Sequence, residues 1–184
     1  MDTNVFYPRE NTKKSNKKTV VAVCQGWSDI KGLPQAIALA NELGEDVEIR
    51  LIGNMIGNHN LPKNVTAIGY TKNDDELADY YSQADCFVNF STVETFGKVV
   101  IEALACGTPA VVFASTALRE IVTEDCGKTV EVNDIKAMAY AVKEIFEKGK
   151  KYYTQRCVSL VREKYCYSLQ VEKYLEFYKR VQND

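Results

Sequence analysis

Two carboxylates and a helix start stand close together in the middle of the chain. Glu94 lies in a small polar segment that follows an apolar run, and Glu102 interrupts the otherwise apolar stretch Val99–Ala105. Gly97, between them, precedes a helical pattern whose first turn carries free backbone N–H groups and the positive end of the helix dipole. Such a turn binds an anion, and carboxylates accept hydrogen bonds from hydroxyl groups. The segment therefore predicts a site for a phosphorylated polyol such as a sugar nucleotide.

Each of these residues also has a simpler interpretation. Glu102 would face water if it lay on the solvent edge of its helix, and the helix dipole alone would stabilise Glu94. Gly97 would let a ligand approach the backbone, whereas the Lys98 side chain would add charge or point to solvent. The occurrence of both acids around one amide-lined turn is what favours a binding site.

The elements that would position this site alternate between strand and helix along the chain. Apolar, β-branched runs predict strands at Thr19–Cys24, Val47–Ile52, Val65–Ile68, Cys86–Phe90, Ala110–Phe113 and Lys128–Val132. Helical spacing predicts helices at Lys31–Leu43, Asp74–Ser82, Gly97–Cys106 and Ala117–Val122, and a helical tail from Ile135 to the end. Short strands that are apolar on both faces indicate a doubly wound α/β fold, in which a parallel sheet is covered by helices on both faces. In such sheets ligands bind at the carboxyl ends of the strands.

Composition excludes several classes of protein. The chain has 184 residues, and Lys and Arg total 23 against 25 Asp and Glu, which is a net charge of −2 and argues against nucleic-acid binding. No run approaches 18 apolar residues, so a transmembrane helix is not expected. Six cysteines without a C-x-x-C pair, together with the lack of a secretory signal, indicate reduced thiols in a cytoplasmic protein. One histidine without clustered cysteines argues against a metal site.

Two segments flank the expected domain core. Residues 1–18 are expected to be a linker, with a basic run at Lys13–Lys18, and residues 19–184 form the domain with its C-terminal helices. In the tail, an apolar stripe at helical spacing is expected to pack in the core, although an exposed stripe would indicate a partner surface. The stripe consists of Val171, Tyr174, Leu175, Tyr178 and Val181.

The segment around the two acids resembles the donor-site signature of glycosyltransferase family 4. Glu94 and Glu102 stand eight positions apart, with Phe96-Gly97 between them and Ala103-Leu104-Ala105-Cys106-Gly107-Thr108-Pro109 after them. The similarity extends over residues 19–182. Trp27–Leu33 is similar to the family's phosphate-binding lysine loop, and Arg119–Val122 is similar to its Glu-Ile-Val element. The family's nucleotide-base region resembles three stretches, Ile68–Tyr70, Glu76–Tyr81 and Ala84-Asp85. The resemblance implies a retaining enzyme with two facing Rossmann-like domains, the GT-B architecture.

The resemblance also implies roles for individual residues. Glu102 would bind the ribose hydroxyls, Glu94 would hold the donor sugar, and Lys31, which is otherwise an ordinary helix-start lysine, would neutralise the diphosphate. Backbone groups would make the remaining contacts with the donor. The amides of Thr95, Phe96 and Gly97 would bind the sugar hydroxyls, and those of Lys98 and Val99 would bind the distal phosphate. The backbone of Gly69, Tyr70 and Thr71 would contact the base. The implied donor is a UDP- or GDP-sugar, with no metal and no protein nucleophile. Gly26 stands where family members often carry Arg, so one diphosphate contact is expected to be lost or supplied elsewhere.

By the same resemblance, Asp2–Pro8 is similar to an interdomain stretch that follows an acceptor-binding domain. The expected function is therefore that of the donor-binding half of a hexosyltransferase in polysaccharide or glycan assembly, inactive on its own. Its acceptor, a glycan or lipid-linked sugar, would bind a missing N-terminal domain, and the whole enzyme would work in the cytoplasm, with peripheral association at the inner membrane surface. The alternatives are a non-catalytic sugar-nucleotide-binding or partner subunit, and a flavodoxin-like domain. The lack of an acidic phosphoacceptor loop after the first strand argues against the last.

Overall fold

A six-stranded parallel sheet forms the centre of the protein in a computed structural model, which describes residues 1–10 and 16–183. The strands are β1 (Lys18–Trp27), β2 (Val47–Met55), β3 (Val65–Gly69), β4 (Cys86–Asn89), β5 (Ala110–Phe113) and β6 (Gly127–Val130). Their order across the sheet is β3-β2-β1-β4-β5-β6, and every neighbouring pair is parallel. The predicted doubly wound sheet is therefore confirmed. Its strand order reverses between β1 and β4, which is where such folds bind ligands.

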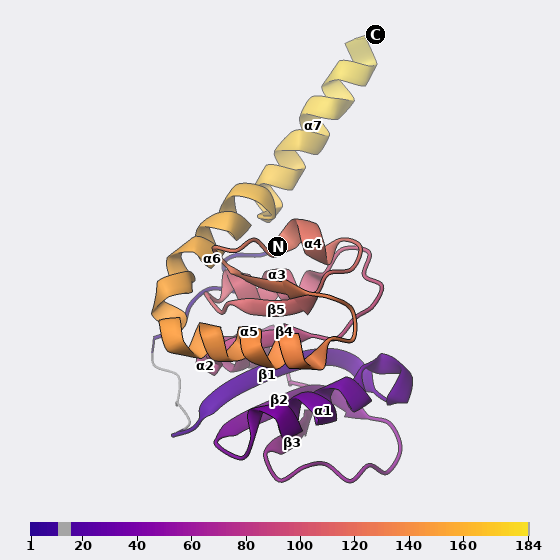
Figure 1. Cartoon of the computed structure of the whole chain (residues 1–184). Helices are drawn as coiled ribbons and strands as arrows, with labels where there is room; N and C mark the ends of the chain where they lie inside the picture. The colour runs from indigo at the N-terminus through magenta and orange to yellow at the C-terminus, as the bar shows by residue number, and fades with distance from the viewer. Residues whose placement is uncertain (11–15, 184) are drawn as a thin grey trace.

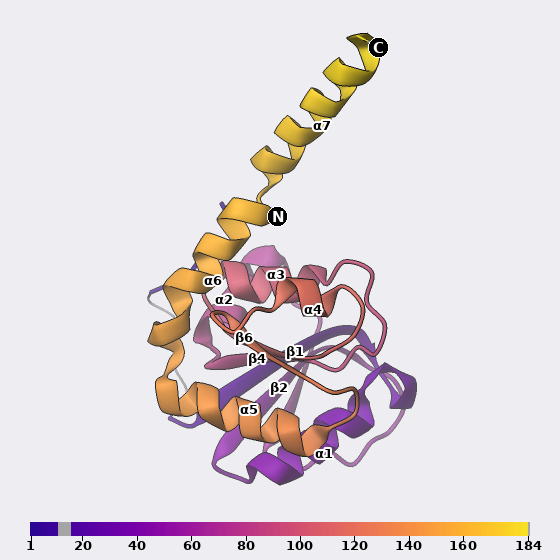
Figure 2. The ribbon, with the colours of Figure 1, turned by 45° about the horizontal axis from the view of Figure 1, so that its top comes forward.

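Helices cover both faces of this sheet (Figure 1). The helices are α1 (Leu33–Leu43), α2 (Asp74–Gln83), α3 (Lys98–Ala105), α4 (Leu118–Ile121), α5 (Ile135–Lys148), α6 (Lys150–Lys164) and α7 (Tyr167–Asn183), with a short 3-10 turn, η1, at Asp29–Lys31. In the tilted view of Figure 2, α1 and α5 run beside each other on one face, and α3 packs with α2 and α6 on the other. The expected helix at Lys31–Leu43 is therefore divided, because Gly32 adopts a left-handed φ of 87° between η1 and α1.

The central strands and the cysteines are the most deeply buried parts of the fold. Every residue of β4 and β5 is buried, as expected for strands covered on both faces. Four cysteines are also buried, and burial raises the pKa of each thiol, for Cys106 to about 12. The four are Cys86, Cys106, Cys126 and Cys157. They pack as small apolar side chains, whereas Cys24 and Cys166 remain partly accessible.

The N-terminal segment, expected to be a linker, packs along α2. Phe6 is buried, and its ring lies 6.2 Å from the ring of Tyr81. Arg9 forms ion pairs with Asp75 (2.6 Å) and Asp79 (3.1 Å) on the exposed side of the same helix. Of the expected basic run, Lys13, Lys14 and Ser15 lie outside the described residues. The segment therefore contacts the domain through apolar packing, ion pairs and hydrogen bonds, among them one from the Arg9 amide to the Ser82 hydroxyl at 3.3 Å.

The C-terminal tail differs from the expectation. It is helical throughout, but α7 stands away from the body (Figures 1 and 2) and leaves Val171, Tyr174, Leu175, Tyr178 and Val181 exposed. The expected core packing of this stripe is wrong, because the spacing shows that one face is apolar but not that the chain covers it. No helix among the described residues is long and apolar enough to cross a membrane.

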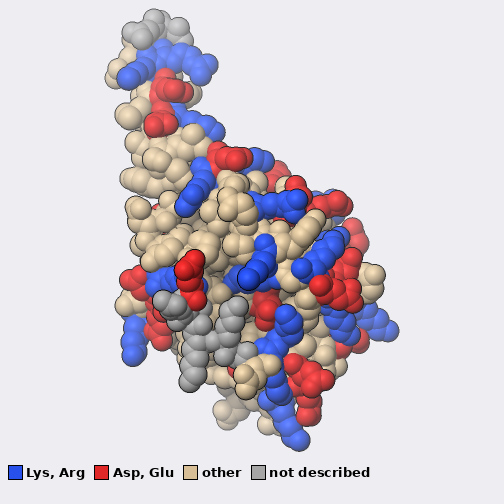
Figure 3. All heavy atoms as spheres, turned by 90° about the vertical axis from the view of Figure 1, so that its left-hand side faces the viewer, with Lys and Arg blue, Asp and Glu red and all other residues tan. Residues whose placement is uncertain are grey.

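Charges of both signs are interspersed on the surface. On the face shown in Figure 3, Lys and Arg side chains alternate with Asp and Glu, in agreement with the net charge of −2. This face therefore offers no broad cationic surface of the kind that holds a nucleic-acid backbone.

Candidate functional site

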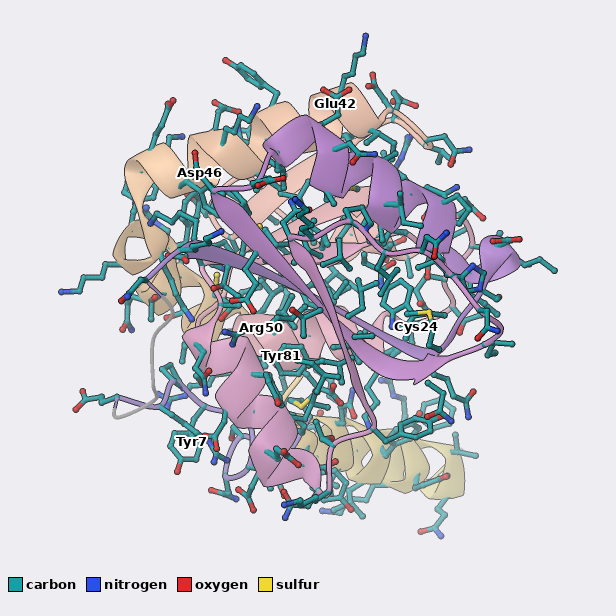
Figure 4. The ribbon with its side chains drawn as sticks, turned by 90° about the horizontal axis from the view of Figure 1, so that it is seen from below. Tyr7, Cys24, Glu42, Asp46, Arg50 and Tyr81 are labelled. Atoms are coloured by element: carbon teal, nitrogen blue, oxygen red, sulfur yellow. The ribbon has the colours of Figure 1, made fainter. Side chains whose placement is uncertain are left out.

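A cleft of about 860 Å³ lies at the carboxyl ends of the central strands. The residues that line it come from the ends of β1 to β4, from the loops that follow them, and from the first turns of α1 and α3. They are Val23–Ser28, Ile30–Gly32, Gln35, Asn54, Ile56, Tyr70, Val88–Glu94 and Val99. Figure 4 shows Cys24 at this end of β1, well away from Glu42 and Asp46 near the start of β2. The cleft thus lies where the strand order reverses, as predicted for a doubly wound sheet.

The loop after β1 is held rigidly against the loop after β4. The Trp27 side chain is buried, and its indole N–H donates to the carbonyl of Ile52 at 3.0 Å. Its ring meets the edge of Phe90 at a centroid distance of 6.3 Å. A Cβ on Gly32 would lie 2.7 Å from the Cβ of Phe90, so this close approach requires glycine. The aromatic contact and the glycine together fix the turn that carries Lys31.

Lys31 brings a positive charge to the rim of the cleft. It is exposed at the last position of η1, and its amide donates to the carbonyl of Ser28 at 3.0 Å. Within residues 1–10 and 16–183 no carboxylate forms an ion pair with its ammonium group. The charge is therefore open to an anionic ligand.

The loop after β4 turns Glu94 toward its own backbone. One carboxylate oxygen, Oε1, accepts hydrogen bonds from the amides of Thr95 (3.1 Å) and Phe96 (3.4 Å). The Thr116 hydroxyl holds the same loop from the other side, because it accepts from the Glu94 amide (2.9 Å) and donates to the Glu94 carbonyl (2.6 Å). Thr116 has a φ of 32°, a strained value for a β-branched residue. The second Glu94 oxygen, Oε2, has no hydrogen-bond partner among the described residues.

The helix start at α3 is built differently from the expectation at one position. Gly97 has a φ of 70°, and a Cβ there would lie 2.8 Å from Ile121 and 3.0 Å from Leu118. Its missing side chain therefore makes room for α4 rather than for a ligand. The backbone amides of Lys98 and Val99 begin the helix, and no hydrogen-bond acceptor for them occurs among the described residues. These are the free donors that an anion site at a helix start requires.

Glu102 lies inside the protein and not on a solvent edge. Its side chain is 4% exposed, with Oε2 accepting from the Tyr81 hydroxyl at 3.0 Å and Oε1 lying 3.4 Å from the Lys98 ammonium. Burial raises the pKa of Glu102 above its usual value. The Lys98 charge and the Tyr81 hydrogen bond each lower the pKa, but the effect of burial is larger. The simpler interpretation of Glu102 as a solvated acid is wrong. Lys98 covers the outer oxygen with a side chain that is itself 72% exposed.

The end of β3 closes one side of the cleft. Gly69 has a φ of 77°, with open space where a Cβ would stand, and Tyr70 is largely exposed. The Tyr70 hydroxyl donates to the carbonyl of Gln25 at 2.7 Å. This contact ties the end of β3 to the end of β1 across the cleft.

Ile56 fills the space beside Gly26, the position at which members of the family that the chain resembles often carry Arg. A Cβ on Gly26 would lie 2.7 Å from the Cδ1 of Ile56. A longer side chain at position 26 therefore requires movement of Ile56, and the two residues present an apolar wall.

The predicted site residues divide into two groups. Lys31, Tyr70, Glu94 and Val99 line the cleft. The others stand behind or beside it: Gly69, Thr71, Thr95, Phe96, Gly97, Lys98 and Glu102. The sequence reasoning assigned no role to Gln35, Asn54, Thr116 or Tyr81, although Tyr81 lies in a stretch that resembles the nucleotide-base region. No local pattern distinguishes these residues, because their contacts join elements far apart in the chain.

Comparison with known proteins assigns the chain to a family. The family described as "Glycosyl transferases group 1" matches residues 6–157, which is more than half of the chain. Over 127 residues the chain is 32% identical to a GDP-mannose-dependent alpha-(1-6)-phosphatidylinositol dimannoside mannosyltransferase of Mycobacterium tuberculosis. That match includes 66% of this chain and 33% of the relative, so the chain spans about a third of the relative's length.

Solved structures share the fold. Sucrose-phosphate synthase of Thermosynechococcus elongatus superimposes with a TM-score of 0.86 at 22% identity, over 100% of this chain and 51% of that chain. The C-terminal domain of a group 1 family protein, LpcC of Francisella tularensis, superimposes with a TM-score of 0.76 at 25% identity. This match covers 91% of this chain and 99% of that domain. Anabaena Alr3699/HepE, in complex with UDP-glucose, superimposes with a TM-score of 0.80 at 16% identity. This match covers 98% of this chain and 56% of that chain. Because the sheet order, the helical tail and the family match agree, the chain belongs to the group 1 glycosyltransferases, and its fold is a Rossmann-like half of the GT-B architecture.

Proposed function

We propose that this chain is the donor-binding half of a retaining glycosyltransferase of family 4. It would hold a UDP- or GDP-sugar in the cleft at the carboxyl ends of β1 and β4. The observation that carries this proposal is a set of groups at and beside one cleft: the Lys31 ammonium, the Glu94 carboxylate, and the amides of Lys98 and Val99. Among the residues that the structure describes, the ammonium has no ion-pair partner and the two amides have no hydrogen-bond acceptor. The C-terminal domain of LpcC, which matches along almost its whole length, supports the assignment to a C-terminal half.

The donor would lie across the cleft with its diphosphate at the start of α3. The departing diphosphate gains negative charge in the transition state, so a fixed ammonium and preorganised amides stabilise that state more than the ground state. The Oε2 atom of Glu94 would accept a hydrogen bond from a hydroxyl of the donor sugar. The Oε1 atom of Glu102 would accept hydrogen bonds from the ribose hydroxyls, which would displace the Lys98 ammonium from it. The departing phosphate would help to deprotonate the acceptor, with neither a metal nor a protein nucleophile.

The names of the relatives support a nucleotide-sugar donor without choosing its base. The Mycobacterium relative is named for GDP-mannose, whereas the Anabaena structure holds UDP-glucose. The acceptor, a glycan or lipid-linked sugar, would bind an N-terminal domain outside this sequence, so the chain alone would not transfer sugar. We place the whole enzyme in the cytoplasm, in polysaccharide or glycan assembly at the inner membrane surface.

A thermal-shift screen over UDP-, GDP- and ADP-sugars tests this proposal. Bound ligand stabilises the folded state, so we expect UDP- or GDP-sugars to raise the melting temperature by a few degrees at about 100 times the Kd. The free sugars and inorganic pyrophosphate serve as controls and should produce smaller shifts. If no nucleotide raises the melting temperature, or if a soaked crystal holds the nucleotide outside the cleft, the proposal fails.

A further inference from the structure

Tyr81 joins the buried side of Glu102 to the N-terminal segment. It lies on α2, is completely buried, and points into the interior in the view of Figure 4. Its hydroxyl donates to Glu102 Oε2 at 3.0 Å. A buried phenol needs a hydrogen-bond partner, and a carboxylate is a strong one.

The two oxygens of Glu102 have different surroundings. Oε2 is held inside by the Tyr81 hydroxyl, whereas Oε1 faces the Lys98 ammonium, whose side chain is largely exposed. An exposed lysine is readily displaced, but a buried phenol is not. The orientation of the carboxylate is therefore set from the inside by Tyr81.

Tyr81 itself is fixed by its ring and by its backbone. The ring lies between Phe6 and Phe87, at centroid distances of 6.2 Å and 5.7 Å. The Tyr81 carbonyl accepts hydrogen bonds from the Thr108 hydroxyl (2.6 Å) and the Lys150 ammonium (3.3 Å). These contacts leave the hydroxyl little freedom to move from Glu102.

We propose that Tyr81 is a positioning residue of the donor site, which holds the Glu102 carboxylate ionised and oriented for the ribose, with Phe6 supporting the phenol ring from the N-terminal segment. This inference rests on the proposed function. It also extends the site to Phe6, whose ring contacts that of Tyr81 although the residue does not line the cleft.

A purely structural role would consist only of satisfying a buried hydroxyl. The two roles differ in their effect on ionisation. The charged and titratable groups around Glu102 are Lys98 on its own helix, Cys106 directly after that helix, and Tyr81 and Asp74 on α2. Burial and Asp74 raise the pKa of Glu102, whereas Lys98 and the Tyr81 hydroxyl lower it. Removal of the hydroxyl therefore raises the pKa further.

The test is the pH dependence of nucleotide binding by the Tyr81→Phe variant, measured by calorimetry with UDP and GDP between about pH 5 and pH 8. Ribose hydroxyls donate to the ionised carboxylate, so the affinity of the unmodified chain should fall as acid protonates Glu102. In the variant this fall should begin at a higher pH, and the affinity at neutral pH should drop about fivefold. A change in stability alone does not move this pH profile.

Tyr153→Phe is the matched control. Tyr153 is also completely buried, and its hydroxyl has no hydrogen-bond partner among the described residues. It lies on α6 away from the cleft, so its variant should keep the affinity and the pH profile. As a second measurement, Tyr81→Phe added to Glu102→Gln should cause no further loss of affinity, because no carboxylate remains to be held in its ionised form.

The outcomes separate the two proposals. If the unmodified chain binds a nucleotide but Tyr81→Phe keeps both its affinity and its pH profile, the positioning role is overturned and the proposed function stands. If the unmodified chain binds a nucleotide with no loss in acid, Glu102 is not the acceptor and the inference is again overturned. If neither UDP nor GDP binds, the proposed function fails and the inference fails with it.

Discussion

Glu94 lies in the loop before α3 and Glu102 lies within that helix, and the two acids are held in different ways. The backbone of Glu94 is held by Thr116, and its carboxylate rests on amides of its own loop. Glu102 is buried in α3, and its orientation depends on a side chain from α2. The rim acid is therefore positioned by contacts between exposed loops, whereas the inner acid is positioned by the core.

The two acids should therefore be sensitive to changes in different parts of the molecule. An acid positioned by its own loop responds to changes in that loop, and solvent weakens its electrostatic effects. An acid positioned by a buried phenol responds to changes in the packing of distant helices.

The largest expected effect is the loss of nucleotide binding on replacement of Glu102. Hydrogen bonds to a charged acceptor contribute about 1.5–3 kcal/mol, so Glu102→Ala should weaken UDP or GDP binding about 10- to 100-fold. Glu94→Ala should change the affinity for the same nucleotides less than about threefold, because UDP and GDP lack the transferred donor sugar that Glu94 would hold. Calorimetry on both variants measures the two losses. Equal losses would show that the two acids do not divide the ligand between them.

A middle-sized effect is expected from Thr116. Thr116→Val keeps the shape and the strained backbone but removes the hydroxyl that holds Glu94, so the free energy of unfolding should fall by about 1 kcal/mol. Urea denaturation measures this change, and Thr116→Ser, which retains the hydroxyl, is the control. If Val and Ser behave alike, the hydroxyl does not hold the rim acid in place.

The smallest effect is expected at Lys31, whose charge is exposed. Lys31→Ala should weaken nucleotide binding by about fivefold at low salt, and the difference should disappear near 0.5 M salt, where the Debye length is about 4 Å. Lys179→Ala, an exposed lysine on α7 away from the cleft, should bind as the unmodified chain does. A loss at Lys31 that persists in high salt would mean that the ammonium is buried by the ligand.

The sequence predicts the sheet well because its signal is local. Four consecutive apolar or small residues, as at Ala110–Phe113, suffice to indicate a buried strand, and Asn73 indicates the helix start that its side chain caps at the Glu76 amide (2.9 Å). The contact of Tyr81 with Glu102 is not predictable in this way, because it joins two helices through the packing of the whole sheet face. The exposure of α7 is not predictable either, since periodicity shows an apolar face without showing its neighbour.

The burial of the cysteines gives the protein a built-in set of chemical reporters. A thiol reagent reaches Cys24 and Cys166 first, since the sulfurs of Cys86, Cys106, Cys126 and Cys157 are shielded until the fold opens. Cys24 borders the cleft, so its labelling rate should report whether a ligand occupies that cleft. The slower labelling of the four buried cysteines should report unfolding. One untagged molecule thereby distinguishes ligand binding from opening of its core.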